Sequence, residues 1–322
     1  MQPSVVLPVL FDVLPRVARI TLYIALGVFA ANLVVSLGLV ERIAGLSRYL
    51  TGPANLPDEV GTAIVTTAAS TTAGYGMLAE FRESGNLDDR ETLIAVTINT
   101  FFGFVQHIFT FYWPVLIPIL GYEVGLLYVG SRAAIALAIT ITGVVAGAVL
   151  LSSRPTTTTS SVETDGAGDE ANDQTKRELV EEAAHKTWRK LKRLVPRLAL
   201  VYTLVTLLVQ TTDLDALTAF ADPLATLVGL PGAAVPVIAV FAFDTTAGAA
   251  TIAPLIGETF TSTQAVATML LGGIVSFTVS TFKRSIPFQY GIWGPSFGSK
   301  VIVVNTSLKI VFIALAVALL VA

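Results

Sequence analysis

The chain contains no cysteine and only two histidines among its 322 residues. The missing thiols exclude disulfides, thiolate-bound metals and cysteine-ligated iron–sulfur clusters, and two histidines are too few for a histidine-rich metal site. Charged residues are also scarce, since they make up 13% of the chain, against about 25% in an average soluble domain. The composition therefore predicts no metal and no other cofactor.

Motifs of the common enzyme classes are missing as well. The sequence has no GxxxxGK[ST] phosphate loop, no GxGxxG after a strand, no HExxH and no GxSxG. An ATP-driven pump within this chain is not expected, and no nucleophile with an adjacent base stands out. We therefore predict a protein that is not an enzyme and that does not bind nucleic acid.

What the chain has in abundance is apolar sequence. Hydrophobic residues make up 53%, and the mean hydropathy is +0.73. Several apolar runs reach the roughly 20 residues that a helix needs to cross a bilayer. The alternating ~10-residue segments of a membrane barrel are absent. The sequence predicts an all-α polytopic protein of the cell membrane.

A polar segment divides the sequence in two. We predict a first membrane repeat over 1–151, a partly disordered cytoplasmic linker over 152–188 and a second repeat over 189–322. The linker begins rich in Thr, Ser, Gly and Asp, a composition typical of disorder. From about Lys176 it becomes charged and is predicted to be helical.

The two halves carry matching short stretches in the same order. "LPRVARITLYIAL" (14–26) matches "VPRLALVYTLVTL" (195–207), and the tetrapeptide TTAG follows in each half. An aromatic and proline-rich segment comes later, at 111–121 and 288–298. Its alignment pairs Pro118 with Pro295 and Gly121 with Gly298. We interpret this pattern as an internal duplication.

The two TTAG elements lie in weakly hydrophobic segments, about 57–80 and 232–257. Threonine can hydrogen-bond the backbone and glycine weakens a helix. Interrupted hydrophobic segments at matching places in two halves indicate the binding site of a transporter. Close helix packing by small residues is the alternative for either element alone. The predicted solute-binding residues here are Thr71, Thr72, Gly74, Thr245, Thr246 and Gly248.

Basic residues distinguish two topologies, because they favour cytoplasmic loops. Eight full crossings with a cytoplasmic linker would place six of them outside: Arg42, Arg48, Arg132, Lys283, Arg284 and Lys300. Re-entrant TTAG hairpins would make the halves inverted repeats and leave three outside: Arg16, Arg19 and Arg132. This count favours six crossings, two re-entrant hairpins and inverted repeats.

Asp244 is the leading candidate for ion coupling. It lies in "VFAFDTTAG", and a carboxylate in an apolar segment is costly and therefore a functional candidate. It could bind a proton or a sodium ion. The alternative is that it caps the helix that follows it.

Two donor pairs are further candidates for solute binding. At a shift of 177 residues, Gln106 and His107 align with Lys283 and Arg284. Facing donor pairs would suit an anionic or hydrogen-bond-rich solute. The alternatives are a positive-inside anchor for the basic pair and a packed, satisfied side chain for the histidine.

At the duplicated TTAG, the asparagine-bearing helix (Asn99) and the aromatic and proline-rich segment, the sequence resembles the nucleoside-recognition (Gate) domain membrane proteins of archaea and bacteria. These are similar to spore-maturation membrane proteins and, more remotely, to the membrane domain of ferrous-iron transporters and to concentrative nucleoside transporters. The resemblance implies two gate units around a solute path. Iron transport is not implied, because the chain lacks the GTPase domain and the gate cysteines of that branch.

The sequence thus predicts a secondary transporter or permease for a polar, anionic or nucleoside-like solute. Its partners would be that solute, membrane lipid, a coupling cation and a second copy of the chain. Two alternatives stay open: a flippase for phosphorylated lipids, and a membrane scaffold that contacts partners through the helix expected at 176–193.

Overall fold

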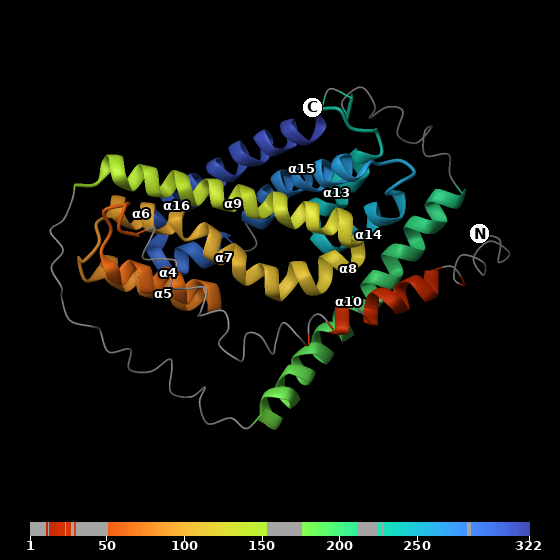
Figure 1. Cartoon of the computed structure of the whole chain (residues 1–322), viewed down its shortest axis with the longest axis horizontal. Coiled ribbons are helices and arrows are strands. Elements are labelled where there is room, and N and C mark those ends of the chain that lie inside the picture. Colours follow the sequence, from red (N-terminus) through yellow and green to blue (C-terminus); the bar gives the residue numbers. More distant parts are fainter. Residues whose placement is uncertain are drawn as a thin grey trace. The chain divides into compact units, whose positions relative to one another are not determined.

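The computed structural model describes residues 51–152, 176–211, 225–226, 228–281 and 285–322, together with 11, 13–22, 24–26 and 29. Nearly all of them lie in helices, and the described part contains no strand (Figure 1). The predicted all-α fold is therefore confirmed. The segments that precede TTAG and follow it are helices, as is the charged end of the linker, where α10 (Lys176–Thr211) begins.

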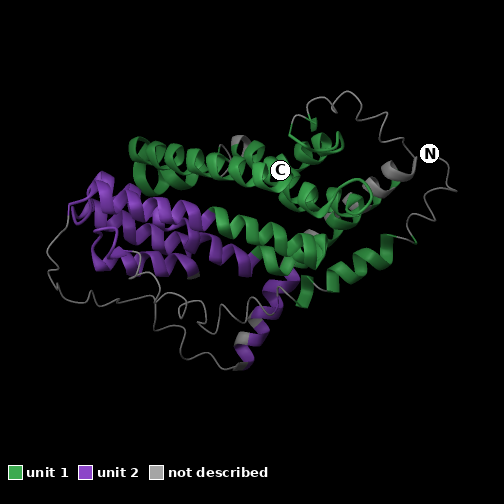
Figure 2. Cartoon of the chain, turned by 45° about the horizontal axis from the view of Figure 1, so that its top comes forward, with its two compact units in different colours: residues 1–27, 111–135, 190–322 green, residues 28–110, 136–189 purple. Residues whose placement is uncertain are grey.

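The chain forms two compact units, coloured separately in Figure 2. Unit 1 comprises residues 1–27, 111–135 and 190–322, and unit 2 comprises 28–110 and 136–189. The units divide the chain differently from the sequence halves, because 111–135 belongs with the later part of the chain. Since halves are defined by sequence similarity and units by packing, the predicted domain boundaries stay a prediction.

Unit 2 is built on four short helices of the first half. These are α4 (Asp58–Ala69), α5 (Thr71–Glu83), α6 (Asp89–Ile98) and α7 (Thr100–His107). Helix α4 packs against the other three. Its core contains Ile64, Leu78, Ile98 and Phe102, all at most 1% exposed. This packing holds α5, which begins with the first TTAG element, against α4.

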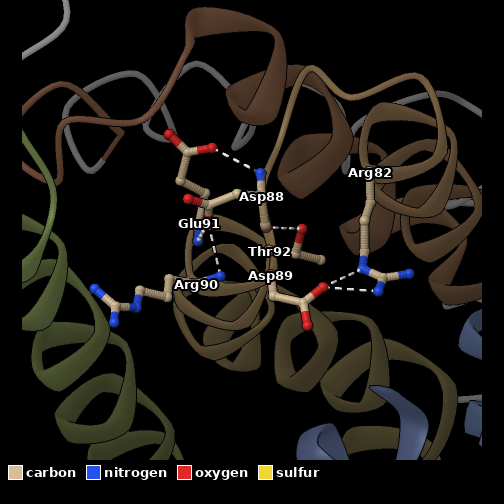
Figure 3. A network of polar contacts seen from close by, with 6 residues as sticks. All are labelled: Arg82, Asp88, Asp89, Arg90, Glu91 and Thr92. Carbon is tan, nitrogen blue, oxygen red and sulfur yellow. Dashed lines mark hydrogen bonds and ion pairs between the residues drawn. The ribbon is translucent and has the colours of Figure 1, made fainter. Parts of the chain in front are cut away.

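The start of α6 is determined by a capping box, seen from close by in Figure 3. The Asp88 carboxylate accepts hydrogen bonds from the N–H groups of Arg90 (2.7 Å) and Glu91 (2.8 Å). The Glu91 carboxylate accepts one from the N–H of Asp88 at 2.8 Å. Arg82 pairs with Asp89 at 2.7 Å and ties the end of α5 to the start of α6. Such a cap contributes about 1 kcal/mol.

Unit 1 contains the helices of the second half. They are α13 (Ala234–Phe243), α14 (Thr245–Ile252), the 3₁₀ turn η4 (Ala253–Leu255), α15 (Ser262–Ser280) and α16 (Ile286–Val321). Helix α13 packs against α14 and α15, and α15 packs against α16. Helix α14 also contacts α8 (Ile117–Leu120) from the first half. A capping box starts α15, with Thr261 as the cap and Gln264 as its reciprocal partner.

Three helical stretches among the described residues are long and apolar enough to cross a membrane. They are Asp89–Leu120, Tyr122–Leu150 (helix α9) and Ile286–Val321. The first includes a π-helical segment, η2 (Ile108–Leu116), with Pro114 inside it. Large apolar side chains on α9 and α16 are exposed, such as Val149 (75%) and Leu319 (74%). Lipid is the environment in which such surfaces are stable, so these findings support membrane association.

Candidate functional site: two interrupted helix pairs

The first TTAG element begins a new helix directly after a break. Helix α4 ends at Ala69, Ser70 is extended (φ −145°, ψ 107°), and α5 starts at Thr71. The Ser70 hydroxyl accepts a hydrogen bond from the N–H of Ala73 at 3.3 Å. Serine is a favoured cap because its oxygen satisfies an N–H that the first helical turn leaves unpaired. Ser70, the polar residue before TTAG, therefore fixes where α4 ends and α5 begins.

The second TTAG element has the same local geometry. Helix α13 ends at Phe243, Asp244 is extended (φ −150°, ψ 115°), and α14 starts at Thr245. The Asp244 carboxylate accepts a hydrogen bond from the N–H of Ala247 at 2.8 Å. The capping role weighed for Asp244 is thus present in the structure. This cap uses one carboxylate oxygen of Asp244. The ion-coupling role of Asp244 stays a prediction.

The glycine of each tetrapeptide lies against the preceding helix. A Cβ on Gly74 would stand 2.6 Å from the carbonyl oxygen of Ala63 and would overlap the Thr67 hydroxyl. A Cβ on Gly248 would stand 2.6 Å from the Cα of Phe241. In a continuous helix, residues seven apart are separated by about 10 Å along the axis. These contacts therefore show that the chain reverses at both breaks.

Around the first break, polar side chains join α5 to α7. The Thr71 hydroxyl donates to the side-chain oxygen of Gln106 at 2.7 Å. The structure thus brings together two of the predicted site residues. Thr72, one position on, is exposed. His107 is also exposed, and its Nδ1 lies 2.9 Å from the carbonyl oxygen of Gly103 in its own helix.

A second polar contact lies deeper in unit 2. The buried Asn99 donates to the Thr67 hydroxyl at 2.9 Å, and Thr67 donates to the carbonyl of Ala63 at 3.1 Å. The side-chain oxygen of Asn99 is buried and has no hydrogen-bond partner among the described residues. Asn99 entered the sequence reasoning as part of the family resemblance, and Thr67 was missed. The only signal for Thr67 is its place seven residues before Gly74.

Thr140 of α9 is a further residue that sequence reasoning missed. Its hydroxyl donates to the carbonyl of Ile98 at 2.8 Å and accepts from the N–H of Phe101 at 3.1 Å. The side chain thereby enters the irregular turn between α6 and α7. Insertion of a side chain into the backbone ladder is one of the established causes of a helix bend.

The second break is more apolar around its glycine. Phe241 lies against Gly248 and also against Gly272 of α15, where a Cβ would stand 2.9 Å from the phenylalanine side chain. Thr245 and Thr246 are half-buried. Polar character here is concentrated on Asp244 at the break itself. The two helix pairs thus share their backbone geometry and differ in their side chains.

The backbone conformation of the proline-rich segments favours a different alignment from the predicted one. Gly121 (φ 82°, ψ 165°) and Gly294 (φ 74°, ψ 166°) adopt the same left-handed conformation. Gly298, the predicted counterpart of Gly121, is helical and lies against the carbonyl of Gln289. These two glycines are 173 residues apart, against the predicted shift of 177. At a shift of 173, Gln106 and His107 would not align with Lys283 and Arg284, a basic pair that lies outside the described residues.

Arg132, which the topology count placed outside, lies ten positions after Tyr122 within α9. The nearest signal in the sequence was a single charge in an otherwise apolar run. No group of three or more metal-binding side chains occurs in the part of the chain that the structure describes.

Comparison with known proteins finds three similar proteins from Methanocaldococcus jannaschii. The chain is 24% identical to the uncharacterized protein MJ0880 over 315 residues, 97% of this chain and 99% of that protein. It is 27% identical to the uncharacterized protein MJ0871 over 299 residues, 91% and 89% of the two chains. The uncharacterized protein MJ1556 is 29% identical over 94 residues. No family model matches, and no solved structure matches. Two of these archaeal proteins are thus similar to this chain over nearly its full length.

Proposed function

We propose that the protein is a polytopic membrane permease, a secondary transporter for a polar, anionic or nucleoside-like solute. The two halves would be repeats of inverted topology, and the interrupted helix pairs would bind the solute and the coupling ion. The observation that carries this proposal is the pair of matched helix breaks at Ser70 and Asp244. The charge count of the sequence supports the inverted arrangement.

The duplication is supported by features that recur at a nearly constant shift. Breaks, close glycine contacts, capping boxes and left-handed glycines follow each other in the same order in both halves. The pairs are Ser70 and Asp244, Gly74 and Gly248, Asp88 and Thr261, and Gly121 and Gly294, at shifts of 174, 174, 173 and 173 residues. Four kinds of local structure that recur at shifts of 173 or 174 residues support a common repeat.

The lengths of the paired helices explain why a break suggests a path. Helices α4 and α5 contain 12 and 13 residues, and α13 and α14 contain 10 and 8. At 1.5 Å per residue the longest is about 20 Å, short of the ~30 Å hydrocarbon core. A helix pair that reverses within a membrane needs partners for its freed backbone groups. Buried protein surfaces or a water-lined cavity supply them, and a transporter uses the latter.

The side chains at the breaks suggest a division of roles. Thr71 and Gln106 offer hydrogen-bonding groups at the start of α5, where the N-terminal amides also point outward from the helix. Asp244 adds a carboxylate at the start of α14, the end where a helix dipole stabilises negative charge. We assign solute binding to the first pair and cation coupling to Asp244. The resemblance to Gate-domain proteins supports the same reading.

The absence of native cysteine permits a direct test of a wet path. Thr72→Cys and Thr246→Cys are labelled in membranes with a charged thiosulfonate that cannot cross lipid. Thiols react as thiolates and therefore need water. We expect both positions to react. The control is Val145→Cys on α9, where the native side chain is 56% exposed on an apolar face; it should remain unlabelled.

The comparison between positions decides the outcome. If Thr72→Cys and Thr246→Cys are as unreactive as Val145→Cys in folded protein, the breaks are dry and the permease proposal is wrong. Labelling that a candidate solute, such as uridine or inorganic phosphate, slows at both positions would connect the two breaks to one path.

A further inference from the structure

Two cations lie within the long apolar helices of unit 1. Arg132 is on α9, about 15 Å along the helix from Tyr122, and Lys309 is on α16, about 18 Å from Val321. Both side chains are half-buried. Charged side chains within membrane-spanning helices are costly, and they usually mark an ion or substrate pathway.

Arg132 has two tyrosines as neighbours. Its guanidinium hydrogen-bonds the side chain of Tyr112 and lies close to Tyr128. The rings of Tyr112 and Tyr128 are 6.1 Å apart, and both residues are buried. On the α15 side, a guanidinium nitrogen is 3.5 Å from the position that a Cβ on Gly273 would occupy. The guanidinium therefore lies against α15 at Gly273.

Lys309 belongs to the same surroundings. Its ammonium lies over the ring of Phe277 on α15, 6.0 Å from the ring centre. Gly273 and Phe277, the residues of α15 that lie next to Arg132 and Lys309, are four positions apart and thus about one helical turn from each other. Two like charges repel each other, and the aromatic face offsets only about 0.5–2 kcal/mol.

Neither Arg132 nor Lys309 has a carboxylate within one turn on its own helix. There is no Asp or Glu between residues 259 and 322, and none between 124 and 162. The nearest acid on α9 is Glu123, nine positions before Arg132 and thus about 13 Å away along the helix. Glu123 accepts a hydrogen bond from Ser262 at 2.6 Å.

Charges in an apolar environment are stable only when they are paired. We propose that Arg132 and Lys309, with the hydroxyl of Tyr112, form a binding site for an oxyanion, a phosphate or carboxylate group. The planar guanidinium can hold two oxygens of such a group in a fork, and the lysine supplies a second positive charge. This inference rests on the proposed transport function and names the charge of its solute. A free solute and the phosphate of a lipid headgroup share this chemistry.

The test measures thermal unfolding of the full chain by tryptophan fluorescence. One arm adds potassium phosphate to protein in neutral detergent, against potassium chloride of equal ionic strength. The other arm compares nanodiscs of phosphatidylcholine with and without phosphatidylglycerol. A ligand that binds only the native state raises the melting temperature by mass action.

We expect one of these oxyanions to raise the melting temperature of the wild type. This shift in melting temperature should be lost in Arg132→Gln and in Lys309→Gln. Arg132→Lys should keep part of it. The control, Lys300→Gln, removes an exposed lysine of the same helix that lies 5.9 Å from a phenylalanine ring centre and should keep the full shift. Without oxyanion, either charge-removing variant should melt no lower than the wild type, since one repelling charge is gone.

A shift with phosphate identifies a free solute, and a shift with phosphatidylglycerol alone identifies a lipid headgroup. The proposal is overturned if neither source stabilises the wild type, or if the shift persists in both charge-removing variants. Thiol labelling at Thr72 and Thr246 does not involve Arg132 or Lys309. A wet path without oxyanion binding would therefore refute this inference and leave the transport proposal standing.

Discussion

Replacing Gly74 by alanine tests the close contact that closes the first helix pair. The new Cβ would meet two backbone atoms of α4, the carbonyl oxygen of Ala63 at 2.6 Å and the amide nitrogen of Thr67 at 2.7 Å. Backbone atoms cannot rotate away as a flexible side chain can. Helices α4 and α5 would have to separate to accept the methyl group.

Two opposing terms determine the size of the effect. Overpacking of this kind costs about 1–3 kcal/mol, while alanine in place of a helical glycine returns up to about 1 kcal/mol. Gly76 lies two positions along the same helix, is exposed and would have nothing within 4 Å of a new Cβ. Gly76→Ala should therefore stabilise by propensity alone, and the difference between the two variants isolates the steric cost.

The assay is unfolding of purified full-length protein, followed by the fluorescence of its three tryptophans. We expect Gly74→Ala to be less stable than Gly76→Ala by about 1–3 kcal/mol. Equal stability of the two variants would show that α4 and α5 do not approach closely, and the reasoning about a reversal at Ser70 would fail with it. Gly248→Ala should behave like Gly74→Ala, because Phe241 presents its Cα at 2.6 Å.

Two further predictions concern the breaks. Asp244→Asn keeps a favoured cap and removes the charge, so it should abolish uptake into proteoliposomes with little change in stability, whereas Asp244→Ala should also lose about 1 kcal/mol; wild-type uptake by Asp244→Asn would remove the carboxylate from coupling. A double-mutant cycle with Thr71→Val and Gln106→Leu should give a coupling of about 0.5–1.5 kcal/mol in unfolding free energy. A coupling near zero would mean that their 2.7 Å hydrogen bond does not form.

The weak places in the helices could be predicted from the sequence because their cause is local. Threonine, glycine and a preceding polar residue disfavour a continuous helix wherever they occur. The side chain that caps each new helix, Ser70 or Asp244, stands directly before its tetrapeptide. The capping role of Asp244 was accordingly among the readings that the sequence allowed.

The sequence alone left the register of the later segments ambiguous. Aromatic residues and prolines recur often enough in 111–121 and 288–298 to align at a shift of 177 residues, and Pro114 with Pro287 and Gly121 with Gly294 align at a shift of 173. The backbone favours the shift of 173, because Gly121 and Gly294 share a positive φ. Any glycine can adopt a positive φ, so the residue type alone does not show which glycine adopts it.

Composition and apolar run length by themselves determined that this is a helical, membrane-associated protein, because the need to satisfy backbone groups in lipid acts on every segment separately. Which side chains meet was decided only by tertiary structure. The contact of Thr71 with Gln106 joins residues 35 apart, and the grouping of Arg132 with Lys309 joins residues from two distant helices. Such contacts depend on how whole helices pack, and the local sequence pattern does not contain that information.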